Sequence, residues 1–315
     1  MKNDYLYSTT HKAVVHIKLK PQSTYIFGYS AEERSHIGDE LMISHPDGIN
    51  FIRLNELDKE TIEDANTSEK YFLRSGISIK NLLLQSDNRN LYIDVTGLDN
   101  RICAALIKNA IECCVSLDLD NVIVVYAEPG SYNTKQFKAE SVFNDLSEKI
   151  EGIEPLPGFA TIFPEDDVDM FLVALLGFEG GRFIHMLENV QPQRENVIPI
   201  VGVPGFRLEY PHIAYWGNRR PLEETDTWRK IKFAAANSLV DIYMVLSKIM
   251  NKHPTYKMKL APIGTKPHAI GAMLFAIKHP KKVELVYDNP KRKIQRTEGV
   301  GQIVECLISK LIKEN

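Results

Sequence analysis

The hydrophobic and polar positions of the chain follow a unit that recurs four times. In each unit an apolar run ends in a glycine-containing loop, a helix-like stretch follows, and a second apolar run closes the unit. The units span residues 24–54, 91–128, 169–206 and 256–288, and their loops read GYSAEERS, TGLDNR, GFEGGR and IGTKPH. Strands that alternate with helices through short loops are typical of parallel sheets with right-handed crossovers.

This pattern predicts an α/β fold with two Rossmann-like lobes of mostly parallel sheet flanked by helices. The Pro/Gly-containing stretch EGIEPLPGFA marks the expected boundary between an N-terminal lobe (1–154) and a C-terminal lobe (155–315). One long doubly wound sheet is the alternative. In the C-terminal lobe a long amphipathic helix is expected over 226–251, with Asp226 as N-cap and Pro254 just beyond its end.

Several shorter elements follow from local patterns. Partial alternation over 11–19 predicts an opening strand, and Ser30 with Glu33 matches a capping box at the start of a short helix. The polar segment 55–90 is expected to connect the units through one or two helices. Two more helices are predicted over 139–150 and 302–312.

Composition adds only broad bounds. The chain has 315 residues, 44% hydrophobic and 25% charged, as in a soluble globular protein. Its net charge of −3 does not indicate nucleic-acid binding. The N-terminus lacks a signal-peptide core and the longest apolar run is too short to span a bilayer, so we expect a cytoplasmic protein with no membrane partner. The cysteines are expected to be buried reduced thiols: Cys103, Cys113, Cys114 and Cys306.

In open α/β sheets, ligands bind outside the carboxyl ends of the strands, so the loops there define the candidate site. Small residues and cations gather in these loops, which is how such a fold holds an anion. The candidate ligand-binding residues are Arg34, Thr96, Gly97, Arg101, Gly180, Gly181, Arg182, Gly264, Thr265, Lys266, His268, Arg292 and Lys293.

Two of these loops carry the sharpest prediction. Three glycines in GFEGGR let the backbone approach a ligand, and free N–H groups at the start of the following helix favour an anion. In IGTKPH, Thr265 can cap the helix and Lys266 can meet a phosphate. Arg182, Lys266 and Arg292 are expected to neutralise the phosphate. The alternative is a pair of ordinary, well-capped turns. Neither a Walker A motif nor GxGxxG is present.

Carboxylates also stand at or near four strand ends: Asp94, Glu128, Glu179 and Asp288. They are the candidate catalytic residues, because paired carboxylates hold Mg²⁺ or act as acid and base. They could equally accept ribose hydroxyls, or pair with nearby arginines. Specific metal ligands and cofactors are not identified, with Mg²⁺ the candidate ion. No nucleophile signature of the GxSxG, HExxH or Cys–His type occurs.

The entries LYIDVTGLDNR and LAPIGTKPHAIGAMLFA resemble the T-G-G-T-K turn of CARF domains, the Rossmann-like sensors of cyclic oligonucleotides in prokaryotic antiviral defence. The two-lobed layout is similar to that of SAVED modules, which carry two CARF-like lobes. Leu98 and Asp99 depart from the expected turn. The resemblance implies a sensor that uses Thr96, Gly97, Thr265 and Lys266 near its ligand.

The leading hypothesis is therefore a protein that binds or senses a nucleotide or other phosphorylated ligand, as a component of an antiviral defence system. A separate effector protein is the expected partner. One alternative is a metal-assisted or acid–base hydrolase or transferase acting on a nucleotide or nucleoside. The other is a scaffold subunit of a larger complex.

Overall fold

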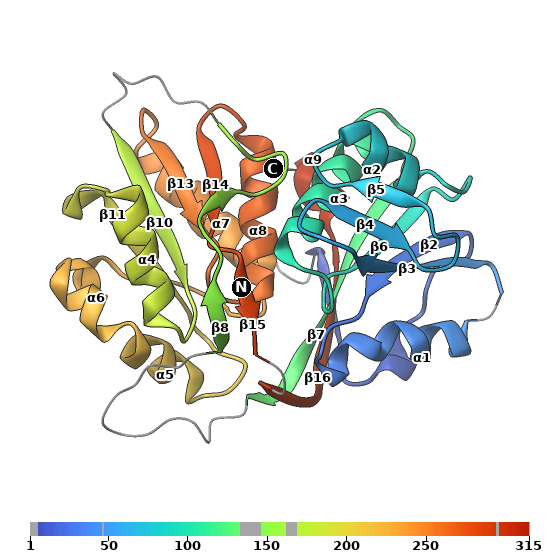
Figure 1. The fold of residues 1–315 in the computed structure, drawn as a ribbon, viewed down its shortest axis with the longest axis horizontal. Helices are drawn as coiled ribbons and strands as arrows, with labels where there is room; N and C mark the ends of the chain where they lie inside the picture. The colour runs from blue at the N-terminus through green and yellow to red at the C-terminus, as the bar shows by residue number, and fades with distance from the viewer. Residues whose placement is uncertain (1–5, 46, 133–145, 162–168, 294–295, 315) are drawn as a thin grey trace. The chain divides into compact units, whose positions relative to one another are not determined.

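A computed structural model describes residues 6–45, 47–132, 146–161, 169–293 and 296–314. The chain forms two compact units. The central unit contains residues 134–293. The N-terminal unit contains residues 2–133 and also the last segment, 294–315. In Figure 1 the dark red end of the chain is therefore grouped with blue and cyan elements of the N-terminal unit.

The expected division after residue 154 differs from this one in a simple way. The chain leaves the N-terminal unit about twenty residues earlier and returns to it for its last strand and helix. The return is stabilised by pairing of β16 (Thr297–Leu307) with β7 (Asn121–Tyr132), which is antiparallel. A boundary read from a Pro/Gly-rich stretch does not reveal such a return, because strand pairing is a long-range interaction.

The central unit is a six-stranded, mostly parallel sheet with the order β12-β11-β10-β13-β14-β9. Its strands are β10 (Met170–Leu176), β11 (Val197–Gly202), β12 (Lys232–Ala234), β13 (Lys257–Ala261), β14 (Val283–Tyr287) and the antiparallel edge β9 (Glu154–Pro155). The order of the five parallel strands is that of a Rossmann-like sheet, so the predicted α/β class with parallel sheets and flanking helices is confirmed.

Helices cover both faces of this sheet (Figure 1). They are α4 (Gly180–Val190), α5 (Tyr210–Gly217), α6 (Arg219–Glu224), α7 (Leu239–Lys252) and α8 (Lys266–Lys278). α4 packs with α6, and α7 packs with α8. Alternate residues of β10, Leu172 and Leu176 among them, join Phe183 and Met186 of α4 in one core cluster. The unbroken apolar run MFLVALL fits a strand that is covered on both faces.

The N-terminal unit is built on an eight-stranded sheet with the order β1-β16-β7-β6-β2-β3-β4-β5. Besides β7 and β16, its strands are β1 (Ser8–His11), β2 (Ser23–Gly28), β3 (Ile49–Glu56), β4 (Thr61–Asp64), β5 (Lys70–Phe72) and β6 (Asn90–Asp94). The four central strands, β7, β6, β2 and β3, are parallel, and the two strands at each edge are antiparallel.

The helices of this unit are α1 (Ile37–Ser44), α2 (Gly76–Leu83), α3 (Asn100–Val115) and α9 (Ile308–Glu314), with 3-10 turns η2 (Val14–His16) and η3 (Glu33–His36). Ile37 and Leu41 of α1 share a core cluster with Tyr25 and Phe27 of β2. α2 packs against α3. The cysteines are buried free thiols: Cys103, Cys113, Cys114 and Cys306.

Some local predictions in this unit are wrong for identifiable reasons. The expected strand over 11–19 is replaced by β1 and η2, because Val14 and Ile17 reach the core from a 3-10 turn rather than from a pleated strand. The Ser30 capping box does not form. The Ser30 hydroxyl accepts the N–H of Glu32 at 3.2 Å, and the Glu33 carboxylate accepts the N–H of Gly299 at 3.1 Å.

The segment 55–90 contains more strand than expected. β4 and β5 form antiparallel pairs, and α2 is the helix of the segment. The Asp58 carboxylate accepts the N–H groups of Glu60 and Thr61 at 2.8 and 2.9 Å, and this favours a turn between β3 and β4. The helix expected over 302–312 is also different, since β16 runs to Leu307 before α9 begins.

The helix expected over 226–251 begins later, at Leu239. Asp226 has φ 54°, in the left-handed region, and precedes only a short 3-10 helix, η6 (Thr227–Lys230), without a side-chain cap bond. Ser238 is the N-cap, and its hydroxyl accepts the N–H of Asp241 at 2.9 Å. Of the helix expected over 139–150, residues 139–145 lie outside the described residues, and β8 (Ser147–Ile150) pairs antiparallel with β15 (Pro290–Arg292).

Candidate functional site

In the sheet of each unit there is one place where two neighbouring parallel strands are continued by strands on opposite sides, so the strand order changes direction there. In the central unit this point lies between β10 and β13, which are adjacent and parallel while their successors β11 and β14 lie on opposite sides. Ligands of open α/β sheets bind at such a point, outside the carboxyl ends of the strands. The loops GFEGGR and IGTKPH follow β10 and β13, so the two sharpest sequence predictions fall at one end of one sheet.

The backbones of these two loops lie close together at two glycines, Gly177 and Gly264. A Cβ at Gly264 would lie 2.7 Å from the carbonyl oxygen of Leu176, and one at Gly177 would lie 3.1 Å from the Cα of Gly264. Such distances exclude any larger residue without a backbone shift. α4 begins three residues after Gly177 and α8 begins two residues after Gly264, so the N-termini of both helices follow closely from this contact.

The first turn of α4 is open to an anion. Its N-cap, Glu179, makes no side-chain cap, and the turn contains no acidic residue. Within the described part of the chain, the N–H groups of Gly180 and Gly181 have no acceptor. Gly181 is exposed, and a Cβ there would meet nothing within 4 Å. Unpaired N–H groups and the helix dipole together favour negative charge at such a turn.

The other α-helices begin in two ways. Side chains accept a backbone N–H in the first turns of α2, α3, α7 and α8, where the caps are Ser75, Asp99, Ser238 and Thr265. Among the described residues, the first turns of α1, α5 and α6 have no side-chain cap, like that of α4. The start of α4 therefore differs from the starts of α3 and α8, which also follow parallel strands. Gly180 is required for a further reason, because a Cβ there would overlap the carbonyl oxygen of Gly217.

At α8 the predicted residues form a well-built helix start. The Thr265 hydroxyl donates to the carbonyl of Ala236 at 2.8 Å and accepts the N–H of His268 at 3.4 Å. Lys266 is the first helical residue and is half-buried. His268 is buried with Nε2 3.0 Å from the carbonyl of Ala235, and burial lowers its pKa to about 4. The imidazole is therefore neutral at pH 7 and adds no positive charge.

The Arg182 side chain forms an ion pair and a further hydrogen bond in the interior of the protein. Its Nε and one terminal nitrogen lie 2.7 and 2.6 Å from the two carboxylate oxygens of Asp288, and its other terminal nitrogen donates to the carbonyl of Ile263 at 2.8 Å. Burial disfavours the charged guanidinium, but the Asp288 carboxylate outweighs this and raises the pKa of Arg182. Glu179 lies 3.7 Å away on the same guanidinium. These contacts give Arg182, Glu179 and Asp288 a structural role in holding the strand ends together.

The remaining cations predicted for this unit lie on its small two-stranded sheet. Arg292 is the last residue of β15, where it pairs with Ser147 of β8, and Lys293 follows it. The backbone N–H of Lys293 donates to the carbonyl of Leu146 at 3.0 Å.

In the N-terminal unit the corresponding point lies between β2 and β6. Here, too, glycines bring two loops together, since a Cβ at Gly97 would overlap the carbonyl oxygen of Gly28. Thr96 joins a third strand, because its hydroxyl accepts the N–H of Ala127 in β7 at 2.9 Å.

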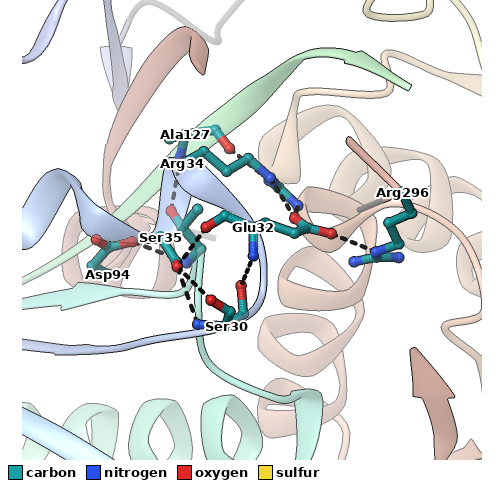
Figure 2. Close-up of polar contacts among 8 residues, drawn as sticks. Ser30, Glu32, Arg34, Ser35, Asp94, Ala127 and Arg296 are labelled. Atoms are coloured by element: carbon teal, nitrogen blue, oxygen red, sulfur yellow. Dashed lines mark hydrogen bonds and ion pairs between the residues drawn. The ribbon is translucent and has the colours of Figure 1, made fainter. Parts of the chain in front are cut away.

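A buried ion network follows β2 (Figure 2). Arg34 donates to one carboxylate oxygen of Glu32 through Nε at 2.7 Å, and Arg296 pairs with the other oxygen. A terminal nitrogen of Arg34 donates to the carbonyl of Ala127 at 2.6 Å. Burial alone would raise the pKa of Glu32, but Arg296 and Arg34 lower it to about 2. Arg34 and Arg296 thus share one carboxylate within the protein.

Arg34 and Arg182 are held in the same way in their two units. Each is buried, each is paired with a buried carboxylate, and each donates to a carbonyl beyond a neighbouring strand. Each guanidinium also lies over a tyrosine ring, at 5.3 Å from the centroid of Tyr126 and 5.8 Å from that of Tyr287. This recurrence supports a structural role for both arginines.

The carboxyl group of Asp94, at the end of β6, has a strongly raised pKa. It is fully buried at the end of β6, accepts the N–H of Thr96 at 2.9 Å and the hydroxyl of Tyr25 at 3.2 Å. Burial raises its pKa to about 6, although the hydrogen bonds of Thr96 oppose this shift. A carboxyl group that titrates near neutral pH can act as an acid or a base.

The other predicted residues of this unit are engaged elsewhere. Arg101 pairs with Asp99 at 3.0 Å and with Glu56 at 2.5 Å, at the start of α3. Glu128 is buried in β7. Asp94 and Glu128 belong to the N-terminal unit, whereas Glu179 and Asp288 belong to the central unit. No cluster of three or more His, Cys, Asp or Glu side chains suited to a metal ion occurs among the described residues.

Sequence reasoning missed three features of these sites. The sequence predicts neither the bridging of two arginines by Glu32 nor the place of Arg296 in that network. Tyr25 carried no signal, since a tyrosine in an apolar strand is typical of a core. The adjacent acidic residues Glu32 and Glu33, just before Arg34, were the one available sign, because a buried arginine needs a carboxylate close by.

Comparisons with known proteins add little to this picture. No family model matches the chain, and no curated protein matches it. A search of solved structures returned an ABC transporter solute-binding protein from Burkholderia multivorans, with 16% identity, 84% of this chain and 78% of that chain covered, and a TM-score of 0.25.

Two further structures have lower scores. A GDP-L-fucose synthetase from Naegleria fowleri has 10% identity, coverage of 95% and 89%, and a TM-score of 0.23. A UDP-GlcNAc 2-epimerase from Methanocaldococcus jannaschii has 10% identity, coverage of 93% and 98%, and a TM-score of 0.20. Scores this low carry no argument about function. Among the described residues, no helix is both long and apolar enough to cross a bilayer.

Proposed function

We propose that the protein binds a phosphorylated small molecule, with a nucleotide as the leading candidate, at the carboxyl ends of β10 and β13. The observation that carries this proposal is the open first turn of α4. Gly180 and Gly181 present backbone N–H groups there, at the point where ligands of this fold class bind.

Two further features support the same place. α8 begins beside it, after the Gly177–Gly264 contact, so a second helix N-terminus contributes to the local field. The internal pairing of Arg182 with Asp288 fixes the loops without using the α4 amides. In this proposal the backbone of α4 binds the phosphate and Lys266, at the start of α8, adds positive charge, while Arg182 acts as a positioning residue.

A sensor role in antiviral defence, with a separate effector, is the biological setting that we propose from the resemblance of the two loops to CARF turns. The proposal for ligand binding does not depend on it. Acid–base chemistry on a nucleotide is the second candidate function, and the buried Asp94 with its raised pKa of about 6 is the observation that favours it.

Isothermal titration of the full chain with pyrophosphate, AMP, ADP and ATP, each with and without Mg²⁺, tests the proposal. Binding of at least one of these compounds is expected, together with a rise in melting temperature, because a ligand that binds only the folded state stabilises it. Chromatography of the same mixtures separates sensor from enzyme, since products form only in the second case. Absence of binding by all four would refute the proposed function.

A further inference from the structure

Arg53 stands out among the arginines near the strand ends of the N-terminal unit. It lies in β3 opposite Phe27, one residue before β2 ends at Gly28. Its guanidinium lies over the ring of Tyr29, 5.0 Å from the centroid, and one terminal nitrogen donates to the Tyr29 hydroxyl at 3.3 Å. This cation is therefore held at the same end of the sheet as the loop that follows β2.

Arg53 differs from the neighbouring arginines in its carboxylate partners. Arg34, Arg101 and Arg296 are each paired with carboxylates at 3.0 Å or less. For Arg53, no carboxylate of the described residues lies within the 4.0 Å of an ion pair. Its Nε is buried and has no acceptor among those residues. A buried donor of a charged group without an acceptor is unfavourable, so the Arg53 guanidinium keeps hydrogen-bonding capacity that the described residues do not use.

The side chains around Arg53 form an organised cluster rather than a mobile surface. The Tyr29 hydroxyl donates to the Asp39 carboxylate at 2.5 Å, and the His36 ring lies 4.6 Å from the Tyr29 ring. His36 is also 3.3 Å from Asp39. Tyr29 remains 39% exposed, so the cluster is open to solvent. Tyr29 thus holds the Arg53 guanidinium within a cluster that solvent reaches.

We propose that Arg53, positioned by Tyr29, is the anchor of a second phosphate-binding site, located in the N-terminal unit. The ligand class is a small molecule with a terminal phosphate or pyrophosphate group, because a planar guanidinium binds two phosphate oxygens at once. The site is separate from the α4 turn of the central unit and does not depend on it. The protein would then bind two phosphate groups per chain.

The test is titration of the full chain with pyrophosphate at low salt, for wild type, Arg53→Gln, Arg53→Lys and the control Arg89→Gln. Arg89 is exposed, pairs with Asp120 and carries the same charge, so its loss reports only the general field. All four proteins are also made in the Gly181→Asp background, which removes the site of the proposed function. Failure of one site then leaves the other measurable.

Arg53→Gln is expected to weaken pyrophosphate binding in the N-terminal unit at least about tenfold, with Arg53→Lys intermediate because it keeps the charge but not the two-pronged geometry. Arg89→Gln should bind as wild type does. Tyr29→Phe tests positioning, and a smaller loss with an unchanged melting temperature is expected. Equal affinity in wild type and Arg53→Gln, or an equal loss in Arg89→Gln, would overturn the proposal.

Discussion

The guanidinium of Arg182 and the carboxylate of Asp288 form a two-pronged ion pair in the interior of the central unit, with N–O distances of 2.7 and 2.6 Å. Arg182 belongs to α4, after β10, and Asp288 follows β14. The same guanidinium also holds the carbonyl of Ile263 after β13. The Arg182 side chain therefore links the ends of three adjacent strands, β10, β13 and β14, around the proposed site. Its positive charge is paired with a carboxylate within the protein.

Removing the carboxylate should be costly. We expect Asp288→Asn to lower the free energy of unfolding by about 3–5 kcal/mol, because it removes the two-pronged partner of a buried guanidinium and leaves it, among the described residues, only Glu179, at 3.7 Å. Urea denaturation measures this loss. Asp120→Asn removes the exposed pair with Arg89 and should cost far less, because solvent screens that pair. Equal costs for the two variants would mean that the Arg182–Asp288 pair does not stabilise the unit.

Gly180 and Gly181 should respond to alanine in opposite ways. A Cβ at position 180 would overlap the carbonyl of Gly217, so Gly180→Ala should destabilise the protein by about 1–3 kcal/mol. At position 181 the space is empty, and alanine should stabilise the helix by up to about 1 kcal/mol. The melting temperatures of the two variants test this difference. If neither variant changed the melting temperature, Gly180 would not pack closely against the turn between α5 and α6.

Asp94 should make stability depend on pH with a defined sign. Its folded pKa of about 6 exceeds the ordinary value of 3.8, so the folded state binds the proton more tightly than the unfolded state. The resulting stabilisation is complete below about pH 3.8 and is lost as the pH rises through about 6. By linkage it amounts to roughly 3 kcal/mol.

Asp94→Asn lacks this titration and keeps a similar shape. The difference in unfolding free energy between Asp94→Asn and wild type should therefore grow in favour of the variant between pH 4 and pH 7. Denaturation of both proteins across this range measures it, and the other titrating groups, such as His268, cancel in the difference. Parallel curves would show that Asp94 titrates normally.

The fold was predictable where local patterns coincide with tertiary structure. The apolar runs of β2, β6, β7, β10 and β13 and the Thr265 cap are predicted by the sequence, because burial and capping are local requirements. The return of β16 to the N-terminal unit could not be read, since it depends on pairing with β7 about 175 residues earlier. The displaced start of α7 shows the same limit, because Asp226 and Ser238 are equally plausible caps by residue type.

For the candidate site, the sequence predicted which loops come together but not which roles the arginine side chains have. GFEGGR and IGTKPH do meet at one end of one sheet, as the order of parallel strands requires. The arginines were harder, because a cation after a strand looks the same whether it faces a ligand or a buried carboxylate. Arg182 and Arg34 are paired internally, and Arg53, inside a strand, gave no signal. Burial decides between these roles, and burial depends on the tertiary structure.

The proposed function depends most on the open first turn of α4. Pyrophosphate and nucleotide titrations of wild type, Gly181→Ala and Gly181→Asp test it most directly. The aspartate places a carboxylate where the phosphate is expected, in space that the structure leaves empty, so it should weaken binding to the central unit at least about tenfold without lowering stability. Gly181→Ala should fold and bind nearly as wild type does. Undiminished binding by Gly181→Asp would contradict the account.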